Sequence, residues 1–386
     1  MSGALHRLVR PYLKRPGGPR VTDGEMLLFI VCVLVTTVGL SGDIARHVQN
    51  PGDLEGDFLS GWHLVLYGGV AAVGACIGLG ALRRGPSYVG AVGTGTIGFL
   101  LLAVGGVADA AWHEVFGTEA RVEALVSPPH LLVFAGLAFL LTAPIVVAWE
   151  RPDRRLGWIA SIAVCTSMIS MLLVTSLFTG YSSPLSGGVS FDTGYVEPVV
   201  GESNSEYDVV RGLSMIVWLA AILSAAHALV LLRFRPKPGL VALGFALLAI
   251  PPYVIGDSDT VKALSLGLVA AGLVAEAGVA VFGRPVLGRL GAVATMALAN
   301  AALWASAFLV LDLDEAMAWP VHLWTGAIAI SVLVAAAAAG VVGLRIPTAA
   351  ELGEPDDEAP EPDRAPDRPP APAWLDDLDD DELFVR

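Results

Sequence analysis

The segment PHLLVFAGLAFLLTAPIVVAW, residues 129–149, decides the fold class. Its only titratable side chain is His130, and as a helix it is long enough to cross a hydrocarbon layer about 30 Å thick. Apolar stretches of similar length recur at about 25–42, 62–82, 90–111, 157–178, 209–232, 239–256, 262–282, 287–310 and 318–344. We therefore expect an all-α integral membrane protein with about ten transmembrane helices, arranged as helical hairpins in a lipid bilayer.

The composition agrees with this class. Of the 386 residues, 55% are hydrophobic and 16% are charged, whereas soluble proteins contain about 25% charged residues. The net charge of −14 is concentrated near the C-terminus, where residues 351–386 include 14 acidic residues and three arginines. Because the remainder of the chain has no strongly basic face to meet phosphates, we exclude nucleic acid as a partner.

Positive charge predicts how the helices are oriented. Sixteen Lys and Arg residues fall in the N-terminal tail, in the even-numbered connections and after the last helix, while four fall in or beside the odd-numbered connections. Basic residues accumulate on the cytoplasmic side of membrane proteins. We therefore expect both termini in the cytoplasm of a multi-pass cell-membrane protein.

Four regions follow from these patterns. Residues 1–24 form a basic cytoplasmic tail, 25–149 two duplicated hairpins, 150–346 six further helices, and 347–386 a disordered acidic tail. Within the third region, the outer loop 179–208 has five carboxylates and no Lys or Arg, and it is predicted either as a lid or as an unstructured connection. The acidic tail alternates acidic and apolar residues near its end, a pattern that can bind a cytoplasmic partner.

The cysteines and two of the histidines are interpreted as structural. Cys32, Cys76 and Cys165 lie in separate apolar stretches without the paired spacing of a disulfide or zinc motif. His6 belongs to the basic tail and His227 to the sixth predicted span.

The other five histidines gather at the predicted outer ends of the spans, and four of them belong to an internal duplication. Each copy has Asp-x3-His at the end of one span and Ser-x2-His at the start of the next. The first copy comprises Asp43, His47, Ser60 and His63, and the second comprises Asp109, His113, Ser127 and His130. Repetition of residue type, position and spacing together indicates a duplicated hairpin.

The spacing has a geometric consequence. Asp and His four residues apart lie on the same face of a helix, and Ser before a helix can cap its N-terminus with His in the first turn. Each hairpin is thus expected to bring one carboxylate and two imidazoles together, which are ligands for copper or zinc. Possible additional ligands lie in the outer connections or beside them: Asp57, Glu123, Asp314 and His322.

The second copy resembles a known family. Asp109–x3–His113 followed by Ser127, Pro128, Pro129 and His130 is similar to the metal-binding segment of the C subunit of copper membrane monooxygenases, the particulate methane and ammonia monooxygenases. The resemblance covers about thirty residues. It implies Asp109, His113 and His130 as ligands of a copper ion near the outer face, and other membrane subunits for a complete oxygenase.

Several alternatives stay open at this point. Asp, Ser and His at helix ends can serve as plain interfacial architecture, or they can handle protons or ions. A transporter of metal or small solutes is a second class, with Glu276 as its best candidate for a polar path. An intramembrane zinc hydrolase, assisted by Ser60 or Ser127, is a third. Whether the protein is an enzyme is left undecided.

Overall fold

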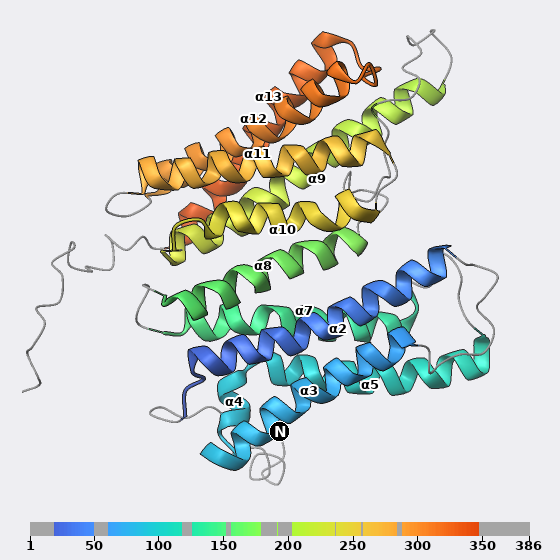
Figure 1. The fold of residues 1–386 in the computed structure, drawn as a ribbon, viewed down its shortest axis with the longest axis vertical. Helices are drawn as coiled ribbons and strands as arrows, with labels where there is room; N and C mark the ends of the chain where they lie inside the picture. Colours follow the sequence, from blue (N-terminus) through green and yellow to red (C-terminus); the bar gives the residue numbers. More distant parts are fainter. Residues whose placement is uncertain are drawn as a thin grey trace, which may run out of the picture.

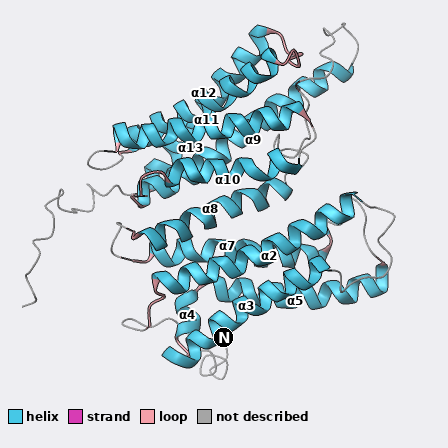
Figure 2. Cartoon of the chain, in the orientation of Figure 1, coloured by secondary structure: helices cyan, strands magenta, loops and turns pink. Residues whose placement is uncertain are grey.

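A computed structural model describes residues 19–49, 61–117, 126–151, 156–178, 191, 203–235, 237–255, 258–283 and 288–346. All regular secondary structure in these ranges is α-helical (Figure 2). The helices are α2 (Asp23–Gln49), α3 (Gly61–Arg84), α4 (Tyr88–Val92), α5 (Thr94–Phe116), α7 (Pro128–Trp149), α8 (Trp158–Phe178), α9 (Ser203–Arg233), α10 (Leu240–Ile255), α11 (Asp259–Phe282), α12 (Arg289–Leu313) and α13 (Val321–Arg345). The tail predictions for 1–18 and 347–386 lie outside this part of the chain.

The chain is a multi-span helical membrane protein. Nine helices of the described ranges are long and apolar enough to cross a membrane. The predicted seventh span corresponds to α10, which has 16 residues and is therefore about 24 Å long, shorter than the hydrocarbon layer. The expected set of about ten spans is thus nine full-length helices and one short one.

Three boundaries differ from the hydropathy pattern. The predicted span 90–111 is divided at Gly93, whose φ is 61°, into the short α4 and the long α5. Helix α2 continues to Gln49, and α9 already begins at Ser203, inside the predicted loop 179–208. The reason is that polar residues extend both helices beyond their apolar segments, where hydropathy carries no signal.

The helices form two groups joined by α8 (Figure 1). Helices α2, α3, α4, α5 and α7 make one group and α9 to α13 the other, while α8 packs against α7 and α2 on one side and α10 on the other. Within the first group the closest pairs are α2 with α3 and α5 with α7. These are the two hairpins that carry the Asp and His motifs.

Arginines tie the helices together at one end of the bundle. Arg84 at the end of α3 pairs with Glu25 at the start of α2, with 3.0 Å between Nη2 and Oε1. Arg151, just after α7, forms an ion pair with Asp23, and its carbonyl accepts a hydrogen bond of 3.1 Å from Arg233 at the end of α9. The Asp and His motifs therefore lie at the opposite end, where α5 ends and α7 begins.

Helices α5 and α7 approach each other through glycines. A Cβ atom on Gly98 would lie 2.6 Å from the carbonyl oxygen of Gly136, and one on Gly136 would lie 2.7 Å from the backbone nitrogen of Leu102. Small residues allow such backbone contact between membrane helices. This close approach continues toward Asp109 and His130 at the ends of the two helices.

Substitution of Gly136 by valine should therefore push α5 and α7 apart. We expect Gly136→Val to lower the free energy of unfolding by about 1–3 kcal/mol, the usual cost of overpacking, measured as a lower thermal unfolding midpoint in detergent. Gly78→Val on α3 is the matched control, because no atom lies within 4 Å of the Cβ position there. Equal stability of the two variants would contradict the glycine contact.

Candidate metal centre

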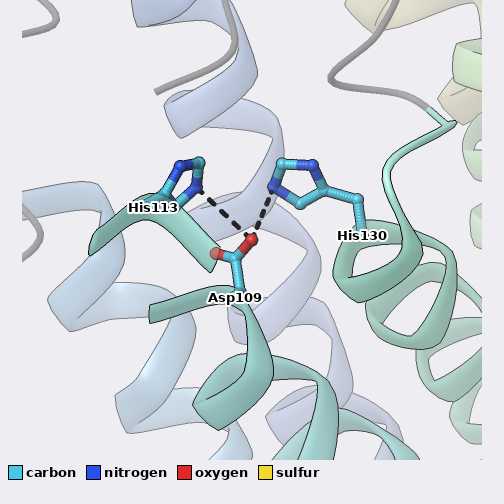
Figure 3. Close-up of side chains that lie close together, drawn as sticks. All are labelled: Asp109, His113 and His130. Carbon is cyan, nitrogen blue, oxygen red and sulfur yellow. Dashed lines mark ion pairs between the residues drawn. The ribbon is translucent and has the colours of Figure 1, made fainter. Parts of the chain in front are cut away.

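Three side chains converge at the end of the α5–α7 hairpin (Figure 3). Asp109 and His113 lie one turn apart on α5, and His130 lies in the first turn of α7. Asp109 Oδ1 is 3.3 Å from His113 Nε2 and 3.1 Å from His130 Nε2. One ligand atom from each residue lies within 4.8 Å of the others. The structure therefore brings together the second predicted set of ligands.

The end of α5 fixes the His113 ring. His113 Nδ1 is 3.2 Å from the carbonyl oxygen of Gly117, and because a carbonyl only accepts hydrogen bonds, Nδ1 carries the proton. Gly117 adopts φ 80°, a conformation that favours glycine. The other ring nitrogen, Nε2, is thereby turned toward Asp109.

The start of α7 orients His130 in a different way from the expectation. Ser127 occupies the N-cap position, but its hydroxyl makes no cap hydrogen bond to the backbone. Instead Ser127 Oγ lies 2.7 Å from His130 Nδ1. Pro128 and Pro129 have no N–H groups to be capped, so the hydroxyl is available to the imidazole. A hydrogen bond to the outer ring nitrogen is a usual way to orient a metal-binding histidine.

The carboxylate oxygen at the centre of the cluster lacks a hydrogen bond. Asp109 is 7% exposed, and its Oδ1 has no hydrogen-bond partner even though two imidazole nitrogens are near. A buried carboxylate oxygen without a hydrogen bond carries a desolvation cost. A positive charge between Oδ1 and the two Nε2 atoms, either a metal ion or added protons, would offset this cost.

The distances suit a transition-metal ion. Zinc and similar ions bind N and O ligands at about 2.0–2.2 Å in tetrahedral geometry, which places neighbouring ligand atoms about 3.3 Å apart. The Oδ1 to Nε2 distances of 3.3 and 3.1 Å agree with this value. Both imidazole side chains are 22% exposed, so the cluster is partly open to the surface.

The first hairpin brings together part of its predicted set. Asp43 Oδ2 on α2 lies 3.5 Å from His63 Nε2 on α3, a pairing that corresponds to Asp109 with His130. The His63 ring stacks on Tyr67 at 5.8 Å between centroids. His47 lies one turn after Asp43 on α2, but its side chain is outside the described part of the structure.

The possible additional ligands do not join either cluster among the described residues. Asp314 and His322 are exposed at the ends of α12 and α13, in the other helix group. Asp57 and Glu123 lie outside the described ranges.

Glu276 has a structural role that the sequence did not reveal. Its carboxylate oxygens accept hydrogen bonds from the backbone N–H groups of Gly239, Val241 and Ala242, at 2.8, 3.2 and 3.2 Å. These donors belong to the N-terminus of the short helix α10 and to Gly239 just before it. Backbone donors within a membrane must be satisfied by protein groups, so Glu276 acts as a cap supplied by α11.

Two further contacts were missed because they depend on packing. Cys32 Sγ on α2 lies 3.8 Å from Cys76 Sγ on α3, although the sequence separation gave no sign of a pair. Phe191, from the predicted outer loop, is fully buried against the rings of Trp304, Phe308 and Trp319. The loop is therefore anchored to the bundle at this residue.

Comparisons with known proteins add no relative: no protein-family model matches the chain, and no curated protein or solved structure is significantly similar to it. The candidate metal centre rests on the geometry of the chain itself.

The Cys32–Cys76 contact predicts a specific cross-link between α2 and α3. Treatment with a membrane-permeable thiol oxidant should remove two protons and two electrons from the pair and form a disulfide, because the sulfurs need to move by less than 2 Å. Peptide mass spectrometry should find Cys32 linked to Cys76, while Cys165 stays reduced. A cross-link between Cys165 and either of the other two would contradict the packing of these helices.

Proposed function

We propose that this membrane protein binds a transition-metal ion through Asp109, His113 and His130. The single observation that carries the proposal is the buried Asp109 Oδ1, which faces two imidazole nitrogens without a hydrogen bond. The Gly117 carbonyl holds Nδ1 of His113 and so turns Nε2 of this ring toward Asp109 as a second ligand.

Copper is the favoured ion and zinc the next. Imidazole nitrogen with one carboxylate suits both ions, and Cu²⁺ binds such ligands more tightly than other first-row divalent ions. The residue pattern also resembles the copper-binding segment of the C subunit of copper membrane monooxygenases. That resemblance implies the same three residues, Asp109, His113 and His130, as the copper ligands.

The centre faces the outside of the cell membrane in this proposal. The arginine-rich ends of α3, α7 and α9 lie opposite the cluster, and basic residues favour the cytoplasmic side. The contact of Asp43 with His63 in the first hairpin is the counterpart of Asp109 with His130, in keeping with duplication of one ancestral hairpin.

The proposed set of ligands suits a metal ion that takes part in a reaction as well as one that is only stored. Three protein ligands with an accessible further position are typical of catalytic metal sites. Bound copper would supply one-electron redox chemistry, while bound zinc would supply an activated water. Residues of this chain would hold the ion and orient the imidazoles, as one part of a membrane oxidoreductase with other subunits.

Transport is the less favoured function. Glu276, the best candidate for a polar path, and Asn300, another buried polar residue, are both engaged in contacts between helices. Glu276 caps α10, and Asn300 on α12 donates a hydrogen bond of 2.9 Å to Ser224 on α9.

Metal analysis of the purified protein tests the proposal. Wild-type protein purified in detergent without chelator, and supplied with copper and zinc, should retain about one ion that is lost in His113→Ala/His130→Ala and in Asp109→Asn. His322→Ala is the matched control, because this histidine also opens a helix but is exposed outside the cluster. Retention in the double variant equal to wild type would refute the centre, and the retained element decides between copper and zinc.

Ser127→Ala should weaken metal binding without removing a ligand. Loss of the hydrogen bond to His130 Nδ1 frees the ring, and such losses typically lower metal affinity about 10–100-fold. Ser258→Ala is the control, because Ser258 caps α11 through a bond of 3.3 Å to Val261 N and lies far from the cluster in sequence and fold. The affinity is measured by competition with a metal chelator; an unchanged value for Ser127→Ala would argue against His130 as a ligand.

A further inference from the structure

A second group of metal-binding side chains lies within the bundle, between α8, α9 and α10. A cavity of 10 Å³ is lined there by His227, Cys165 and Met168, together with aliphatic residues and one glycine. This volume is enough for about one water-sized body. The cavity belongs to neither Asp and His hairpin.

The imidazole of His227 presents an unused lone pair in this region. His227 is 2% exposed, and its Nδ1 lies 2.8 Å from the carbonyl oxygen of Leu223. Because that carbonyl only accepts, Nδ1 carries the proton and Nε2 is bare. Nε2 is buried and has no hydrogen-bond partner. Contact with the Phe245 ring at 4.3 Å between centroids fixes the imidazole plane.

A single water molecule would be poorly satisfied in this cavity. Buried waters usually make about three hydrogen bonds, but the lining offers one imidazole nitrogen, while thiol and thioether sulfur are weak partners. The same three side chains are good ligands for a soft cation, because thiolate and thioether groups select Cu(I).

Nearby charge also favours a cation. The carboxylate of Glu276 accepts a hydrogen bond from the backbone of Val241, a residue of the cavity lining. The carboxylate would thus place negative charge just behind the cavity wall.

We propose that His227, Cys165 and Met168 form a Cu(I) site within the membrane-spanning bundle. Binding exchanges the Cys165 proton for Cu(I), so that one proton is released, one copper–sulfur bond forms and no redox change occurs. His227 lies six residues before Arg233, so the site is about 9 Å from the arginine end of α9.

Anaerobic titration with Cu(I) against a chromogenic Cu(I) chelator tests this site in the full-length protein. The Cys32→Ala/Cys76→Ala background removes the other thiol pair, and it should retain a tightly held Cu(I). Adding Cys165→Ala should abolish this retention, and adding Met168→Leu should lower the affinity at least about tenfold. Met168→Leu conserves volume and is expected to fold, which a monodisperse elution profile verifies.

X-ray absorption of the loaded background protein supplies the second readout. Sulfur and nitrogen neighbours of copper are expected, with the sulfur contribution lost in Cys165→Ala. Asp109→Asn removes the outer centre and should leave the Cys165-dependent Cu(I) retention and the sulfur contribution unchanged, so that this site and the outer centre fail independently. The proposal would be overturned if the background protein and its Cys165→Ala and Met168→Leu variants bound Cu(I) with equal affinity. A copper environment without sulfur would also overturn it.

Discussion

A buried carboxylate oxygen without a hydrogen bond is the constraint on which the candidate centre depends. Asp109 Oδ1 faces His113 Nε2 and His130 Nε2 at 3.3 and 3.1 Å, yet neither contact has hydrogen-bond geometry. In a water-poor environment such an arrangement requires compensating positive charge. A metal ion provides that charge with bonds to all three ligand atoms at once.

The fold creates this arrangement through packing far from the charges. Contact of the α5 and α7 backbones at Gly98 and Gly136 sets the distance between the helix ends that carry Asp109 and His130. Local structure then aims the rings, because Gly117 provides a carbonyl for His113 and Ser127 a hydroxyl for His130. The packing of the two backbones thus places the helix termini, and groups at those termini orient the ligands.

Much of this centre could be predicted from the sequence because it is local. The four-residue spacing of Asp109 and His113, and the position of His130 at the start of an apolar stretch, follow from helix geometry. The Ser127 contact was predicted as a helix cap and is instead a contact with the imidazole of His130.

Features set by neighbouring helices could not be predicted. The pairing of Cys32 with Cys76 depends on the relative rotation of α2 and α3, and the cap of α10 comes from Glu276 on the neighbouring α11. Phe191 likewise takes its place from an aromatic cluster built by α12 and the connection that follows it. Apolar residues cover nearly every face of a membrane helix. Their spacing therefore carries little information about which helix faces contact each other.

Pulsed electron paramagnetic resonance of the Cu(II)-loaded protein tests the central claim most directly. When Nε2 of a ring binds copper, Nδ1 of the same ring is a remote nitrogen that modulates the electron spin echo. The spectrum should therefore show this modulation from two imidazoles in the wild type and from one in His113→Ala. A copper signal without imidazole modulation, or one unchanged by His113→Ala, would contradict the assignment of Asp109, His113 and His130 as a metal centre.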